Sequence, residues 1–277
     1  TLNSLGDGES ALLPPFQVTG DLNAEAKRWG LDERGPGARD YCIKMAWMPD
    51  RSRAIFYGAN HGAPHRLNDV WECDLPSNTW VCLYGPDRSK QNKPEAWEDV
   101  DWDNVAQGVI RTRRGGPAIV PHSWWNMTYD PRLKAMITPC SWSMSHPKLF
   151  QLLKQGKHQP PLWAFYPHTR RWEPILDSQG PLPRYENARA MEFVPDLGGV
   201  VWTKSDGMWL FDGKQNRWSR LGSRQDYGDD LPPREQVMAY LADSKLLVAH
   251  ARACQGKPSV GYPESKTFHY GVDTNEW

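Results

Sequence analysis

The sequence lacks an excess of charge of either sign and lacks long apolar runs. Lys and Arg together number 33, Asp and Glu together number 33, and the formal net charge of the 277 residues is zero. A neutral chain offers no basic surface to attract polynucleotides or anionic membranes. No apolar stretch approaches the roughly 20 residues that cross a bilayer. We therefore expect a soluble globular protein that binds neither nucleic acid nor a membrane.

Cysteine is also scarce. The five cysteines are odd in number and lack the CxxC spacing of zinc and redox sites; they are Cys42, Cys73, Cys82, Cys140 and Cys254. We expect buried thiols and predict no cofactor. A structural zinc or calcium ion remains an alternative, because His61 and His65 are four positions apart in the sequence, as are His250 and Cys254. The chain starts without the pattern of a secretion signal, so the compartment has to be inferred from function.

Glycine and proline, in contrast, are abundant. The chain contains 23 Gly and 24 Pro, a combined share above the usual one, and they are spread along its length. Many turns favour an all-β fold, and all-β chains of this size commonly form one domain. Near the N-terminus we expect one short helix, at Leu22 to Trp29.

A repeat organises the chain. An aromatic residue followed nine positions later by Trp, with a turn between them, occurs four times and predicts four β-hairpins. The copies are Trp71 to Trp80, Trp163 to Trp172, Trp209 to Trp218 and Phe268 to Trp277. Upstream of each copy, two apolar segments flank a second turn. These segments begin at Met45, Met127, Met191 and Met238. Each repeat is therefore predicted to contain four antiparallel strands.

Such four-stranded repeats, with an aromatic residue and Trp toward the end, resemble Kelch-type β-propellers, the fold of the galactose oxidase central domain. The resemblance implies an N-terminal extension at 1–39, a propeller at 40–277 and an insertion at 88–121; the blades fall at about 40–87, 122–181, 182–226 and 231–277. Kelch repeats usually carry a Gly pair after the second strand, whereas this chain has Gly58-Ala59, Pro139-Cys140, Thr203-Lys204 and Ala249-His250. Because the last repeat stops at Trp277, we expect about four blades of a ring that is incomplete in this chain.

In a propeller, the loops entering the first strands and the loops leaving the second strands open on one face, where binding and catalysis usually lie. Aligning the repeats places His, Tyr, Lys, Arg and Trp side chains on that face. Those expected to bind substrate are Tyr41, Asn60, His61, Trp142, Arg184, His250 and Arg252. Arg and Lys can neutralise a carboxylate, and Trp offers a stacking surface, so the set suits an acidic sugar.

The order of these residue types also resembles the propeller-fold ulvan lyases, which are polysaccharide lyases. His122 and Tyr185 stand at matching first-strand positions, while Trp142 and Lys204 stand where that family has His and Arg. The resemblance implies β-elimination on a polysaccharide that contains uronic acid. Lys204 would neutralise the uronate, His122 or Tyr185 would take the proton, and Tyr185 would protonate the leaving oxygen. The predicted catalytic residues are thus His122, Tyr185 and Lys204.

The alternative is a non-catalytic Kelch propeller that holds a glycan or a protein partner with the same loops. It accounts for Trp142 at the place of the second His. Under either interpretation the partner is an acidic polysaccharide or a protein, and the expected location is secreted or periplasmic. A fold does not fix a function, so both interpretations stay open.

Overall fold

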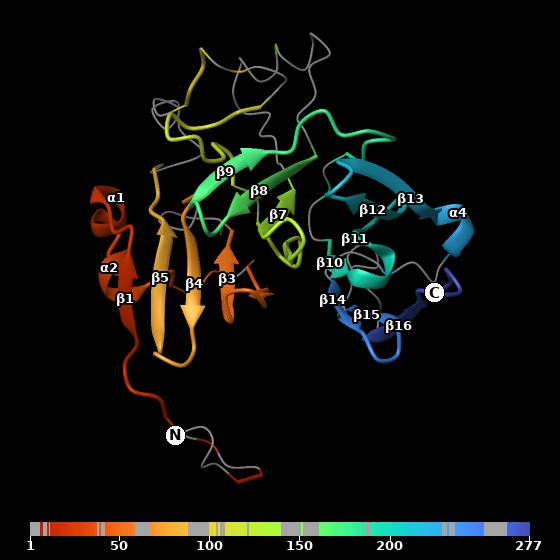
Figure 1. Cartoon of the computed structure of the whole chain (residues 1–277), viewed down its shortest axis with the longest axis horizontal. Helices are drawn as coiled ribbons and strands as arrows, with labels where there is room; N and C mark the ends of the chain where they lie inside the picture. Colours follow the sequence, from red (N-terminus) through yellow and green to blue (C-terminus); the bar gives the residue numbers. More distant parts are fainter. Residues whose placement is uncertain are drawn as a thin grey trace.

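The computed structural model is all-β, with four small sheets that form a four-blade β-propeller (Figure 1). It describes residues 6–7, 10, 12–37, 39, 42–58, 67–87, 100–103, 105, 109–120, 122–139, 151, 161–184, 186, 189–228, 232, 236–251 and 265–277. The sheets follow one another along an arc, from the strands β1 to β5 on the left of Figure 1 to β14 to β16 at the lower right. The predicted fold class is confirmed.

The first three blades contain the four antiparallel strands expected of them. Blade 1 contains β2 (Ala46–Met48), β3 (Arg53–Tyr57), β4 (Val70–Asp74) and β5 (Thr79–Tyr84). Blade 2 contains β6 (Thr128–Asp130), β7 (Ala135–Pro139), β8 (Leu162–Tyr166) and β9 (Arg171–Pro174). Blade 3 contains β10 (Met191–Val194), β11 (Gly199–Lys204), β12 (Gly207–Asp212) and β13 (Arg217–Ser223).

Two sheets differ from the four-strand expectation. Blade 4 has three strands among the described residues, β14 (Gln236–Leu241), β15 (Leu246–Ala251) and β16 (Lys266–Gly271). Blade 1 has a fifth strand, because β1 (Gln17–Gly20) pairs in parallel with β5. Short helical turns complete the structure: α1 (Ala24–Arg28), α2 (Leu31–Arg34), η4 (Pro195–Leu197) and α4 (Arg224–Tyr227). The helix expected at Leu22 to Trp29 is confirmed as α1.

The turn before each repeating Trp contains a left-handed residue. These residues are Asn78, Arg170, Asn216 and Asn275, with φ between 49° and 57°. Asn tolerates this conformation better than most side chains do, which explains its use in three of the four turns. Two of these four turns also accept a hydrogen bond from a segment that precedes the blade in the chain. The Gln179 N–H donates to the Asn216 carbonyl (2.8 Å), and the Gln17 N–H donates to the Asn78 carbonyl (3.0 Å). β1 therefore lies where an inter-blade linker lies at blade 3.

The repeating aromatic residues pack between blades. Trp163 and Trp172 belong to a core cluster shared by blades 1 and 2, and Trp172 contacts Tyr57 of blade 1 with ring centroids 4.8 Å apart. Trp209 and Trp218 occupy the corresponding cluster between blades 2 and 3. Burial of these large aromatic side chains stabilises the packing of one sheet against the next.

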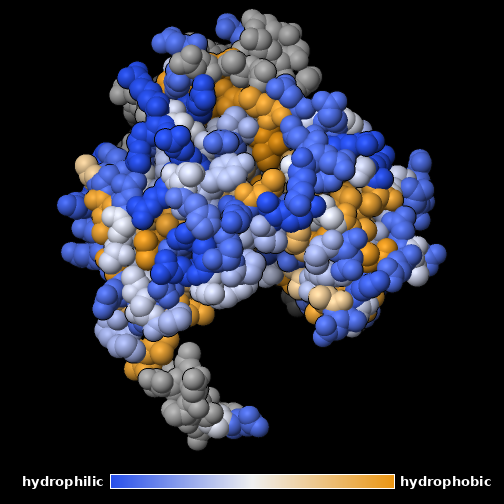
Figure 2. All heavy atoms as spheres, in the orientation of Figure 1, coloured by the Kyte–Doolittle hydropathy of each residue, from blue (hydrophilic) through white to orange (hydrophobic). Residues whose placement is uncertain are grey.

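Successive first strands contact one another in the order β2, β6, β10 and β14, and together they form the inner wall of the arc. Figure 2 shows an open notch at the lower edge, between the first and the fourth blades. On the far side of blade 1, residues of α1 and α2 pack with Phe56, Trp71 and Cys82. The N-terminal region thus covers one face of blade 1.

Candidate functional site

Four of the ten residues predicted for the site belong to the part of the chain that the structure describes. His122 is half-buried, Lys204 is buried, and Arg184 and His250 are exposed. The other six lie outside the described residues: Tyr41, Asn60, His61, Trp142, Tyr185 and Arg252. The geometry of the loop face therefore has to be built from Lys204 and its neighbours.

Lys204 ends β11 and lies against the segment that leads into β10, as the blade topology requires. Its Nζ is 3.7 Å from the Glu186 carboxylate and 3.6 Å from that of Asp206. Only 5% of the Lys204 side chain is exposed, against 49% of that of Asp206. Arg189 adds a second cation, with Nη2 2.5 Å from Glu186 Oε1. Two cations and two carboxylates therefore balance within this cluster.

Glu186 is the centre of the cluster. The backbone N–H and the hydroxyl of Ser205 both donate to its Oε2 at 2.9 Å. Burial alone would raise the pKa of Glu186, but the charge of Arg189 and the Ser205 hydrogen bonds outweigh it and hold the pKa below its ordinary value. The carboxylate is therefore ionised at neutral pH and holds both cations.

The loop that carries His122 joins three blades. Ser123 lies so close to Gly58 of blade 1 that a Cβ on that glycine would come within 2.6 Å of the Ser123 Cβ. Asn126 accepts a hydrogen bond from Trp202 Nε1 of blade 3 (2.9 Å). Between them, Trp124 has φ 48°, an unusual conformation for a bulky residue that is often found at functional sites. The loop is therefore held in a defined shape beside the Lys204 cluster.

His250 is on a different surface. It pairs with Thr267 across β15 and β16, and its Nδ1 is 2.9 Å from the Thr267 hydroxyl. Its neighbours Ala249 and Ala251 face the core shared with blade 3, so His250 points to the opposite side of the sheet. No contact between described residues brings it to Lys204. The structure thus connects the His122 loop to the cluster and leaves His250 apart.

A cavity lies on the inner wall of the arc, where all four first strands meet. Its volume is about 400 Å³, within the range of small-molecule sites. Each blade contributes to it: Met45 and Trp47 from blade 1, Trp125 and Tyr129 from blade 2, Glu192 and Phe193 from blade 3, and Met238 and Ala239 from blade 4. We call this space the central cavity.

An ion pair crosses the inner wall beside the central cavity. Lys44 of blade 1 donates to the Met191 carbonyl (2.7 Å) and pairs with the Glu192 carboxylate, both in blade 3. Its ammonium group also lies over the Trp125 ring of blade 2, 5.6 Å from the centroid. Burial lowers the pKa of Lys44, and the Glu192 charge and hydrogen bond oppose that shift. Lys44 therefore ties three blades together.

The sequence analysis missed Lys44, Glu192 and Trp47. Burial alternates along the first blade, where Lys44, Ala46 and Met48 are buried while Met45 and Trp47 are exposed. The residue types at positions 44–48, KMAWM, do not alternate between polar and apolar, so the sequence offers no signal for this pattern. Met45 stands in register with Met127, Met191 and Met238 in the sequence, but it is 40% exposed whereas those three are buried. In blade 1 the fully buried methionine is Met48. Contacts between blades 1 and 3 join residues about 150 positions apart and leave no local pattern.

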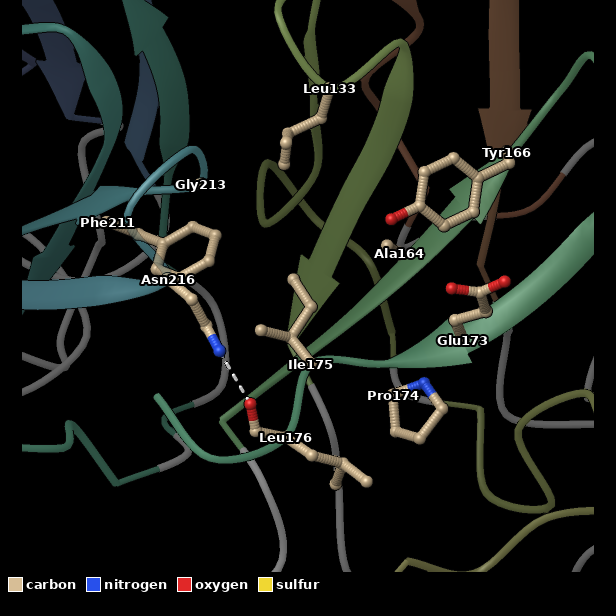
Figure 3. Close-up of a pocket in the computed structure, with 10 residues that line it drawn as sticks. All are labelled: Leu133, Ala164, Tyr166, Glu173, Pro174, Ile175, Leu176, Phe211, Gly213 and Asn216. Carbon is tan, nitrogen blue, oxygen red and sulfur yellow. Dashed lines mark hydrogen bonds between the residues drawn. The ribbon is translucent and has the colours of Figure 1, made fainter. Parts of the chain in front are cut away.

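A smaller pocket of about 230 Å³ lies between blades 2 and 3 (Figure 3). Asn216 closes one side, and its Nδ2 donates to the Leu176 carbonyl (2.7 Å). Tyr166 and Glu173 stand on the other side, on neighbouring strands. Burial and the Glu173 charge raise the pKa of Tyr166, so its hydroxyl stays protonated. Because this pocket is a seam between two blades, the central cavity is the stronger candidate.

The described residues contain no group of three or more His, Cys, Asp or Glu side chains that could hold a metal ion. His61, His65 and Cys254, which the zinc and calcium alternatives involved, lie outside the described part. Within the same described residues, no helix is long and apolar enough to span a bilayer. Cys42 and Cys82 are buried free thiols, as expected, whereas Cys73 is only half-buried. Cys140 and Cys254 lie outside the described residues.

Comparison with known proteins adds little to this description. No protein-family model matches the chain, and no curated protein matches it. Among solved structures, it is similar to the crystal structure of Porphyromonas gingivalis dipeptidyl peptidase 4, with 10% identity and a TM-score of 0.35. The match covers 87% of this chain and 32% of that one, so the chain spans about a third of that protein. A similarity at this level carries no argument about function.

Proposed function

We propose that the chain is a Kelch-type propeller that binds a polysaccharide without cleaving it. The supporting observation is that Glu186 and Asp206 already compensate the charge of Lys204. β-Elimination needs a cation that is available to the uronate, because the carbon acid loses its proton only when the neighbouring carboxylate is neutralised. Lys204 is buried and lies within 3.7 Å of two carboxylates of its own chain. This arrangement favours the non-catalytic alternative over the lyase.

The same cluster suits the binding of hydroxyl groups. Asp206 is half exposed and ionised carboxylates accept hydrogen bonds strongly, so it can accept from sugar hydroxyls at the loop face. The neighbouring turn is fixed, because Trp209 Nε1 donates to Asp206 Oδ1 (3.1 Å). A preorganised acceptor reduces the ordering that binding requires. The Kelch assignment is supported by the repeated left-handed turn and by the Trp that follows it in each blade.

The test measures binding and cleavage on the same samples. The 277-residue protein is run through native gels that contain either uronate polymers, pectate and alginate, or neutral polymers, galactomannan and mixed-linkage β-glucan. The same polymers are incubated with the protein and followed by the ultraviolet absorbance of unsaturated uronate and by size-exclusion chromatography. We expect retardation by at least one polymer, no absorbance rise and no shortening of the polymer.

Either of two results would overturn the proposal. An absorbance rise that disappears in His122→Ala and Tyr185→Phe would establish the lyase, with those residues in catalysis. Migration unaffected by every polymer would exclude glycan binding under these conditions and leave a protein partner as the remaining alternative.

A further inference from the structure

The central cavity combines an exposed aromatic surface with one oriented carboxylate. Trp47 is 54% exposed and Met45 is 40% exposed, although both line a concave site. Large apolar side chains left open in a cavity are unusual in a folded protein and commonly mark a binding site. Trp47 is the middle residue of β2 and the exposed one of its three, so more than half of its surface is open to a ligand.

Most of the polar side chains that line the cavity already make hydrogen bonds within the protein. Tyr129 donates to Asp50 (2.7 Å), and Trp125 Nε1 donates to the Met238 carbonyl (2.7 Å). Lys44 directs its ammonium group to the Met191 carbonyl, to Glu192 Oε2 and toward the Trp125 ring. Glu192 Oε1, in contrast, accepts no hydrogen bond from any described residue. The pair therefore holds a carboxylate oxygen in place as an acceptor.

The charge of the cavity determines which ligands fit. Lys44 and Glu192 are the only charged residues that line it in the described part, and they cancel. An incoming carboxylate would be repelled by Glu192, and it could hardly reach Lys44, whose side chain is 7% exposed and already donates to two oxygens of the protein. It would therefore lose its hydration with little compensation. A neutral ring with hydroxyl groups can instead donate to Glu192 Oε1 and lay its apolar face on Trp47.

We propose that the central cavity binds one neutral sugar ring, with Trp47 as the stacking surface and Glu192 as the hydroxyl acceptor. The inference rests on the proposed function, because it adds a second place on the chain where the glycan is held, apart from the Asp206 acceptor at the loop face. It changes the expected ligand class, since the sequence pointed to an acidic sugar and this cavity prefers a neutral one. The volume of about 400 Å³ accommodates a single ring with room for ordered water.

The test compares Trp47→Ala with two controls. Trp47→Phe keeps an aromatic face, and Leu75→Ala removes an exposed apolar side chain (58% exposed) from the outer turn of the same blade, far from the cavity. Each 277-residue protein is assayed in native gels over a range of galactomannan and mixed-linkage β-glucan concentrations, with pectate and alginate as the acidic probes. Circular dichroism melts confirm that all four proteins are folded.

We expect the wild type to bind a neutral polymer more tightly than either acidic one. Trp47→Ala should weaken that binding about tenfold, while Trp47→Phe keeps most of it and Leu75→Ala keeps all of it. Neutral-polymer binding that is unchanged in Trp47→Ala would overturn this inference and leave the proposed function standing. Tighter binding of pectate or alginate would also overturn it. A wild type that binds no polymer would overturn the proposed function itself.

Discussion

Removing Glu192 should destabilise the protein more than removing Lys44, although the two residues form one ion pair. The Lys44 side chain is 7% exposed and that of Glu192 is 22% exposed. Glu192→Gln leaves a buried ammonium group without its counter-charge, a loss that typically costs about 3–5 kcal/mol. Lys44→Met leaves a carboxylate that water can partly reach, so we expect a smaller loss of unfolding free energy, about 1.5–3 kcal/mol. The difference in exposure sets the order of the two effects.

Urea unfolding followed by circular dichroism measures both losses, and a double-mutant cycle measures their coupling. Because Lys44→Met with Glu192→Gln removes both charges together, the double variant should lose less than the sum of the single losses by at least about 1 kcal/mol. Thermal melts should show Glu192→Gln melting at least about 6 °C below the wild type. Additive losses, or equal losses below about 1 kcal/mol, would refute the claim that a buried ion pair ties blades 1 and 3.

Three further predictions concern other junctions. Gly58→Ala should lower the free energy of unfolding in urea by at least about 2 kcal/mol, because Gly58 has φ +127° and a Cβ would collide with Ser123. An unchanged free energy of unfolding would contradict this packing. Glu186 has a pKa in the folded protein below its unfolded value, so its contribution to stability is present above about pH 4.3 and is lost as the pH falls through the folded pKa. Glu186→Gln should therefore reduce the loss of stability at acid pH. An acid dependence that is unchanged in this variant would contradict the proposed charge cluster. Asp50→Asn should remove about 0.5–1 kcal/mol of stability at pH 7, because Asp50 lies 2.8 Å from His168 Nε2 and accepts from the Tyr129 hydroxyl (2.7 Å), both across blades 1 and 2. Thermal melts with no shift would show that these two contacts together are not stabilising.

The blade architecture could be predicted from the sequence because its signals are local. The aromatic-to-Trp spacing and the apolar segments around each turn lie within single hairpins, and the strands formed where these patterns placed them. The parallel strand β1 could not be predicted in this way. Its four residues, Gln17–Gly20, pair with β5 about 60 positions further along the chain, and nothing in QVTG distinguishes a strand from a loop.

The charges that surround Lys204 could not be predicted from the sequence. The alignment correctly placed Lys204 at the end of a second strand on the loop face, but it gave no information on charge balance. Glu186 reaches Lys204 from the loop that enters the blade, and Asp206 reaches it from the turn after β11. Only the positions of these carboxylates in space reveal that they compensate the charge of Lys204. Trp47 was passed over because the aromatic residues of the repeat are mostly core, whereas this one faces the cavity.

The most direct test of the central claim is the migration of the wild-type chain in native gels with and without polysaccharide, read together with the ultraviolet absorbance of the same mixtures. The account predicts that a neutral polymer retards the protein and that no unsaturated uronate forms from any polymer. Unsaturated uronate from pectate or alginate, or migration that no polymer alters, would contradict it.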